Sequence, residues 1–340
     1  MTVPITMPRF TIRGMAEAMG SPRLTVAFFL LMATGSLWIA QFGGDATVGS
    51  LPPLLLLTIN LMASISTRPR FRADLPLLVF HLALLALVLL LAAARLIYFD
   101  GATILTAGTS FEGHLVKDSR GALHGNGLDT LRFANDGFTE NFPQRGQYLS
   151  TYNRVRWWDE AGGSHVTEIG DDRPLILNGY RIYATARRGF SPTFFWQPAT
   201  GEGGYGTVQL PDSNVDGMGP AVEWQLPSGP MSWVMLNLDS APLPQAGAQR
   251  EGLGEGSMGH HLVLRMGEQR ITLKPGESAE IEGGRMTYVR LNSWMGYRIV
   301  KDPTEPWVVA TVLVGIVSMM WFYVRLLRKP NQQDVLEQVA

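Results

Sequence analysis

Four long apolar runs constrain this chain more than any other feature of its sequence. They cover residues 24–41, 51–66, 75–99 and 307–327. A helix needs about 20 apolar residues to cross the hydrocarbon core of a bilayer, at a rise of about 1.5 Å per residue. The second run has only 16 residues, so a re-entrant or interfacial segment is its alternative, although Pro52 and Pro53 suit the first turn of a helix. The runs predict a membrane protein with four transmembrane helices, three N-terminal and one C-terminal.

The positive charges around these runs predict their orientation, because Lys and Arg favour the cytoplasmic side. They precede the first run, separate the second from the third and follow the fourth: Arg9, Arg13, Arg23, Arg68, Arg70, Arg72, Arg328 and Lys329. Four spans with both termini in the cytoplasm place every cluster on that side, whereas three spans would misplace one cluster. No A-x-A cleavage site follows the first run, so we expect a retained signal anchor.

The long segment between the third and fourth runs differs in composition from the rest. Residues 100–305 hold 18 Lys plus Arg against 24 Asp plus Glu, whereas the remainder holds 10 against 5. A segment of this length can bury a core of its own. We expect the following organisation: a cytoplasmic N-terminus (1–23), a three-helix anchor (24–99), an extracytoplasmic, periplasmic domain (100–305), a C-terminal transmembrane helix (306–327) and a cytoplasmic tail (328–340).

Turn signals between alternating apolar residues predict that this domain is mainly β, as a sandwich or an open barrel. Asn178-Gly179 lies between two apolar runs, which is the strongest short signal for a hairpin. Gly267-Glu268 separates two further alternating runs and predicts a second hairpin. Ser191-Pro192 reads as a turn, and the Gly- and Pro-rich residues 240–259 read as a long mobile loop.

Charge and cysteine content exclude several classes of protein. The net charge of −1 excludes a nucleic-acid binder held by bulk basic charge. The absence of Cys excludes disulfides, thiolate zinc sites and covalent haem attachment through this chain. The sequence has no HExxH or GxSxG pattern, and the glycine-rich residues 201–206 lack the Lys of a phosphate-binding loop. We therefore expect no catalytic residue and no metal site, and the pattern favours a chain that is not an enzyme on its own.

His81 is the main candidate for a functional residue, because it lies within the third apolar run, about 9 Å from its start. Ionisable residues inside membrane spans are uncommon and usually face the bundle or a cavity. A neutral imidazole is also a good iron ligand. The alternative is a histidine that bonds to the backbone of a neighbouring helix or to Asn60.

Three further residues are weaker candidates for ligand binding. Arg95 is expected to extend its guanidinium to the outer interface. It could instead pair with an anion such as a haem propionate, and the carboxylate of Asp100 would compete with that anion for Arg95. His260 and His261 are adjacent on an expected strand, where neighbouring side chains point to opposite faces. They therefore cannot easily chelate one ion together, but either could bind alone.

The remaining histidines and aromatic clusters favour ordinary structural roles. His114, His124 and His165 are expected to be surface histidines. Trp157-Trp158-Asp159 is only a weak signal for haem handling, so core or interface packing is favoured for these tryptophans. Core packing or a partner surface is also expected for a second aromatic set: Phe190, Phe194, Phe195 and Trp196.

Five segments, taken in order, resemble one known family. They are GSPRLT at 20–25, LTINL at 57–61, LLVFHLALL at 77–85, PLILNGYRIY at 174–183 and GYRIVKDP at 296–303. Together with the layout of spans, they are similar to the ResB proteins of cytochrome c biogenesis, system II, in a short variant. The sequence departs from the family at Ala63, where members often carry Cys, and residues 262–306 hold no counterpart of the histidine expected before the last span.

The resemblance implies a ResB-like subunit that assists haem delivery to apocytochrome c, and its attachment there, outside the bacterial inner membrane. Its partners would be a membrane protein of the CcsA/ResC type, apocytochrome c and membrane lipid, and not nucleic acid. The cofactor would be haem b in transit, bound without a covalent link. His81 would be the candidate haem ligand, with Arg95, His260 and His261 as weaker ones.

Two other functions compete with this expectation. The first is a non-catalytic, membrane-anchored periplasmic scaffold for another complex, in which no haem binds. The second is a sensor of small molecules, but about 11 residues after Lys329 are too few for an output domain. A transporter acting alone is disfavoured, because four spans leave no room for a repeat architecture with a site at the midplane.

Overall fold

The computed structural model describes residues 11–142, 144, 150–170, 172–212, 219–225, 231–239, 245–253, 255–256 and 258–328. Within them the chain divides into two compact units. The helical unit takes its residues from 1–99, 120–125 and 302–340. The β unit takes its residues from 100–119 and 126–301. The first and last residues of the expected cytoplasmic segments, 1–10 and 329–340, lie outside the described residues.

The helical unit holds four helices that are long and apolar enough to cross a membrane. These are α2 (Pro22–Phe42), α3 (Ala46–Thr67), α5 (Leu75–Ile97) and α6 (Glu305–Leu327). Two short helices, α1 (Ile12–Met19) and α4 (Pro69–Ala73), accompany them. The predicted four spans are therefore confirmed as helices of sufficient length, and the chain is a multi-pass membrane protein.

Helix α3 is longer than the apolar run that predicted it. It begins at Ala46, because the Asp45 carboxylate accepts a hydrogen bond from the Val48 amide at 2.9 Å and caps the helix. The expectation that Pro52 and Pro53 lie in the first turn is wrong, since both lie inside the helix. A span of 22 residues results, which is long enough to cross the bilayer.

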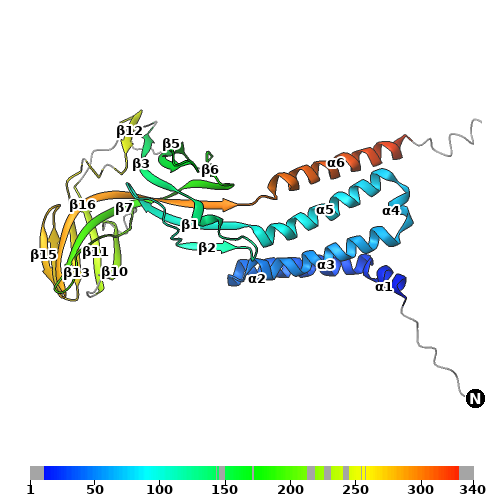
Figure 1. Ribbon diagram of the computed structural model, residues 1–340, viewed down its shortest axis with the longest axis horizontal. Coiled ribbons are helices and arrows are strands. Elements are labelled where there is room, and N and C mark those ends of the chain that lie inside the picture. Colours follow the sequence, from blue (N-terminus) through cyan, green and yellow to red (C-terminus); the bar gives the residue numbers. More distant parts are fainter. Residues whose placement is uncertain are drawn as a thin grey trace, which may run out of the picture. The chain divides into compact units, whose positions relative to one another are not determined.

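The four long helices pack against one another in the order α2, α3, α5 and α6. Helix α3 packs against both α2 and α5, and α6 packs against α5 (Figure 1). Glycine permits the closest approach between α2 and α3, because a Cβ on Gly35 would overlap the carbonyl oxygen of Gly49. Small residues at such contacts are typical of helices packed in membranes.

A return segment, residues 120–125, belongs to the helical unit and closes the C-terminal end of α5. The Gly121 amide donates to the carbonyl of Tyr98 at 2.9 Å, and the Leu123 amide donates to that of Leu96 at 2.7 Å. A Cβ on Gly121 would overlap the Leu96 carbonyl group. The segment therefore satisfies carbonyl groups that a helix end leaves without partners.

The β unit contains three sheets. The largest has eight strands, with the order β2-β1-β16-β7-β6, and β15, β8 and β9 pair with its two central strands. Two four-stranded sheets have the orders β10-β11-β13-β14 and β12-β3-β4-β5. The strands are β1 (Phe99–Thr106), β2 (Lys117–Arg120), β3 (Phe133–Phe142), β4 (Ser150–Trp158), β5 (Ser164–Ile169), β6 (Leu175–Leu177), β7 (Tyr180–Pro198), β8 (Gly204–Thr207), β9 (Leu210–Pro211), β10 (Ala221–Gln225), β11 (Met231–Leu238), β12 (Ala248–Glu251), β13 (His260–Met266), β14 (Gln269–Leu273), β15 (Ser278–Ile281) and β16 (Gly284–Lys301), with a 3-10 turn η1 (Gly127–Thr130).

Two long antiparallel strands, β7 and β16, run through the β unit and carry much of its core (Figure 1). The predicted mainly-β domain is thus confirmed. The Asn178-Gly179 hairpin is confirmed as a two-residue turn, in which both residues have positive φ and Leu177 pairs with Tyr180. The second hairpin is confirmed too, because β13 pairs with β14 around Gly267.

Two sequence-based expectations for this unit are wrong. Ser191 and Pro192 form no turn but continue β7, where Ser191 is buried and its hydroxyl lies 2.9 Å from that of Thr106. The expected loop at 240–259 contains strand β12, which pairs with β3. A buried carboxylate explains this pairing, because Glu140 of β3 contacts the Arg250 guanidinium of β12 at 2.5 Å. Residues 240–244, 254 and 257 of the expected loop lie outside the described residues.

Candidate functional site

The candidate site centres on His81, in the second turn of α5. Its Nδ1 lies 2.7 Å from the carbonyl oxygen of Leu77, one turn earlier in the same helix. Since a carbonyl only accepts, Nδ1 carries the proton and donates this hydrogen bond, and Nε2 keeps its lone pair. Phe71 of α4 stacks on the imidazole with ring centroids 4.0 Å apart, and Phe80 meets its edge at 5.4 Å.

This arrangement is the one that metal-binding histidines commonly show. A ligating imidazole usually donates its other ring N–H to a carbonyl or a carboxylate, which fixes the tautomer and the ring orientation. The helix itself supplies that carbonyl for His81, and Phe71 holds the ring from one side. The residue therefore offers a single, oriented nitrogen ligand within an apolar span.

The alternative that His81 bonds to Asn60 is not what the structure shows. The Asn60 amide instead donates to the carbonyl oxygens of Met19 at 2.5 Å and Ser21 at 3.2 Å. Its side-chain oxygen accepts from the Thr25 hydroxyl at 2.7 Å. Asn60 thus has a structural role, because its hydrogen bonds join the start of α2 to α3. The imidazole of His81 bonds to Leu77 within its own helix instead.

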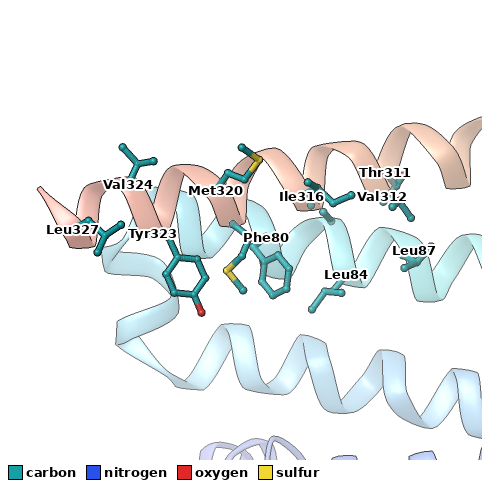
Figure 2. A pocket seen from close by; sticks show the side chains of 13 residues that line it. Phe80, Leu84, Leu87, Thr311, Val312, Ile316, Met320, Tyr323, Val324 and Leu327 are labelled. Atoms are coloured by element: carbon teal, nitrogen blue, oxygen red, sulfur yellow. The ribbon is translucent and has the colours of Figure 1, made fainter.

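An apolar groove of about 590 Å³ lies between α5 and α6 (Figure 2). Figure 2 shows Val324 and Leu327 toward one end, Leu87 and Thr311 toward the other, and Phe80 between them. Its volume falls in the range of small-molecule sites, but it has few of the polar groups that such sites use for orientation. His81 follows the groove residue Phe80 in sequence and does not line the groove itself.

Arg95 and Asp100 each have a partner within their own unit. The Arg95 guanidinium lies over the ring of Tyr98, 5.8 Å from its centroid, at the end of α5. In the β unit, the carboxylate of Asp100 instead forms a two-pronged ion pair with Arg298, at 2.6 and 3.0 Å. Hydrogen bonding to Asp100 raises the pKa of the Arg298 guanidinium further above its usual value.

The adjacent histidines His260 and His261 begin strand β13, where neighbouring side chains point to opposite faces. His261 Nε2 lies 3.1 Å from the side-chain amide of Asn237, directly across on β11. His260 Nδ1 donates to the carbonyl oxygen of Met258 at 2.9 Å, and its ring meets that of Tyr288 edge-on at 5.9 Å. No hydrogen-bond partner for its buried Nε2 is found among the described residues.

The other three histidines differ from one another. His114 is exposed, as expected. His124 is not an ordinary surface histidine, because it stacks on Phe99 at 4.9 Å and its Nδ1 lies 3.1 Å from the Ile97 carbonyl oxygen. The sequence could not reveal this, since the contacts join the return segment to the end of α5.

The imidazole of His165 is half-exposed and lies at the tip of the β4–β5 hairpin, where it is more organised than the sequence suggested. Its Nε2 lies 2.8 Å from the Asp159 carboxylate, and its ring stacks on Trp157 at 4.5 Å. The hydrogen bond from His165 is the main cause that lowers the pKa of Asp159. The strand register brings the two rings together, because Trp157 of β4 lies directly opposite His165 of β5.

The second aromatic set packs largely in the core, as predicted. Phe190, Phe194 and Trp196 of β7 are buried. Phe194 stacks on Trp224 at 5.3 Å, while Phe195 packs at the surface beside the exposed ring of Tyr205. Among the described residues, no group of three or more His, Cys, Asp or Glu side chains is placed to hold a metal ion.

Comparison with known proteins gives one family match. The model of the ResB-like family matches residues 73–229, which extend from the start of α5 to just beyond β10. The search of the curated proteins finds no match. The family match confirms the resemblance that the sequence segments indicated.

Proposed function

We infer, from the match of residues 73–229 to the model of the ResB-like family, that this chain is a subunit of a system II complex for cytochrome c biogenesis. In this role it assists the delivery of haem to apocytochrome c, and its attachment there, outside the inner membrane. It acts beside a membrane protein of the CcsA/ResC type. The β unit would then lie in the periplasm, and both ends of the chain would lie in the cytoplasm.

The observation that carries this proposal is the imidazole of His81. It lies in an apolar span, its Nδ1 donates to Leu77, and Nε2 remains for a ligand. These features suit a residue that would hold haem iron through one ring nitrogen.

The chemistry of attachment suits a chain that positions its cargo. When bound, haem supplies the vinyl groups that the thiols of apocytochrome c attack. This chain has no Cys, so it adds no competing thiol. Its own contribution is to hold and orient the reactants, which can lower a barrier substantially without any catalytic side chain.

The test is His81→Ala in the full chain, purified together with its partner. Haem that co-purifies should fall by tenfold or more, with loss of mature cytochrome c. Added imidazole should restore part of both signals, because it can replace the missing ligand but not a missing structural contact. His124→Ala is a matched control, since it removes a partly buried imidazole of the return segment that contacts the C-terminal end of α5.

Two results would count against the haem role. Unchanged haem and cytochrome levels in His81→Ala would contradict it directly. If only deletion of the β unit abolished cytochrome maturation, while the haem spectrum stayed unaltered in His81→Ala, the chain would act as a scaffold without haem.

A further inference from the structure

One end of the helical unit carries a collar of arginines that have no acidic partner among the described residues. The collar is defined here as four exposed residues: Arg23, Arg70, Arg72 and Arg328. The acidic residues described at this end, Glu17 and Asp74, already pair with other arginines, Arg13 at 3.1 Å and Arg325 at 3.4 Å. The collar therefore holds four positive charges that no described carboxylate neutralises.

Two sets of contacts gather the collar at one end of the unit. The first joins α2 to α3, because the Gly20 carbonyl accepts hydrogen bonds from Ser64 at 2.9 Å and from Arg68 at 2.8 Å. The second joins α5 to α6 through the ion pair of Asp74 and Arg325. The start of α2, the α3–α5 connection and the end of α6 thus lie at the same end of the helices.

Helix α1 adds an apolar surface beside the collar. Ile12 is 89 % exposed and Met15 is 56 % exposed, and their spacing of three puts them on one side of the helix. The opposite side carries the pair Arg13 and Glu17. A short amphipathic helix of this kind, held next to a membrane span, suits the boundary between headgroups and acyl chains.

We propose that the arginine collar and α1 together form a binding surface for anionic phospholipids. The guanidinium groups of the collar would bind the headgroup phosphates, and Ile12 and Met15 would enter the acyl boundary. The inference goes beyond the proposed function and requires only that the four long helices span a bilayer. Charge complementarity supports a lipid, because guanidinium binds phosphate through two parallel hydrogen bonds.

An acidic segment of a partner protein would match the charges of the collar but would leave the apolar side of α1 without a role. The lipid surface matches both, since α1 exposes the apolar side chains of Ile12 and Met15.

The test measures the binding of phosphatidylglycerol and phosphatidylethanolamine to the full chain in detergent by native mass spectrometry. Phosphatidylglycerol should bind more tightly, and the preference should shrink as salt is raised. The double variant Arg70→Gln, Arg72→Gln should reduce the preference by roughly 25-fold, at about fivefold for each arginine. The control pair Arg187→Gln, Arg290→Gln, on the exposed surface of the β unit, should leave it unchanged.

A second variant and a soluble probe separate the remaining outcomes. Ile12→Gln should weaken both lipids by the same factor, and an unchanged affinity would overturn the role of α1. Soluble glycerol phosphate should compete poorly, and equal competition would show a site for soluble anions instead. If the collar variant kept its lipid preference but lost a co-purifying protein, the surface would serve a protein and the proposal would fail.

Discussion

Removing the hydroxyl group should lower the free energy of unfolding at one of the two fully buried tyrosines of β16 and should not lower it appreciably at the other. Tyr297 donates a hydrogen bond to the side-chain oxygen of Asn153 at 2.8 Å, whereas the Tyr288 hydroxyl has no hydrogen-bond partner among the described residues. Both side chains are 0 % exposed. The pair therefore compares a satisfied and an unsatisfied buried hydroxyl on one strand.

The magnitude follows from the network around Tyr297. The Asn153 amide also donates to the Asn135 side chain and to the Gly137 carbonyl, both at 2.9 Å. In Tyr297→Phe the oxygen of Asn153 is left buried without its donor, which costs about 1–3 kcal/mol. Tyr288→Phe removes only an unpaired polar group, so the free energy of unfolding should stay within about 0.5 kcal/mol or rise.

The assay is pulse proteolysis of the full chain in detergent over a series of urea concentrations. Tyr297→Phe should shift the folding equilibrium of the β unit by roughly 5- to 150-fold, and Tyr288→Phe by less than about threefold. Equal effects of the two variants, or a larger effect of Tyr288→Phe, would refute the reasoning. The slope of the free energy of unfolding against urea concentration should be the same in both variants as in the unaltered chain, because the same surface area is exposed on unfolding.

Two further predictions concern the same unit. Burial is the main cause that raises the pKa of both tyrosine hydroxyls above the usual value of 10.0. Their contribution to the free energy of unfolding should therefore be complete below about pH 10 and fall above it, by up to about 1.4 kcal/mol per pH unit for each tyrosine. Tyrosine begins to ionise between roughly pH 8 and 11, so urea midpoints that stay constant over this range would contradict the prediction. Glu140→Ala should cost about 3 kcal/mol, because it strips the shared carboxylate from Arg188 and Arg250. Hydrogen exchange should then rise at 248–251, and protection equal to that of the unaltered chain would show that this ion cluster does not hold β12.

Hydropathy and charge predicted the helices well, because a bilayer imposes length and composition on each span. The second span was harder to predict, since its first turn is Ala-Thr-Val-Gly-Ser and is marked only by the capping residue Asp45. Asn60 made the run look less apolar, but its amide is satisfied by the start of α2. Local sequence cannot show such a partner from 41 residues away.

Strand β12 and the setting of His124 lay beyond sequence reasoning for a similar reason. Four residues within a Gly-rich stretch carry little strand signal, and their pairing depends on Glu140, over a hundred residues earlier in the chain. The hairpin at Asn178 was predictable because both of its turn residues show their conformational preference locally. The position of His81 could be predicted from the sequence, whereas its tautomer required the observed contact with Leu77.

The serial packing of the long helices has a consequence for any cargo. Helices that follow one another as α2, α3, α5 and α6 make a row about one helix deep, and such a row cannot by itself enclose a path across a bilayer. A molecule held near α5 would move along the flank of the row, with lipid or a second protein as the opposite wall. The route would thus open sideways to the membrane, and its width would depend on the neighbour that completes it.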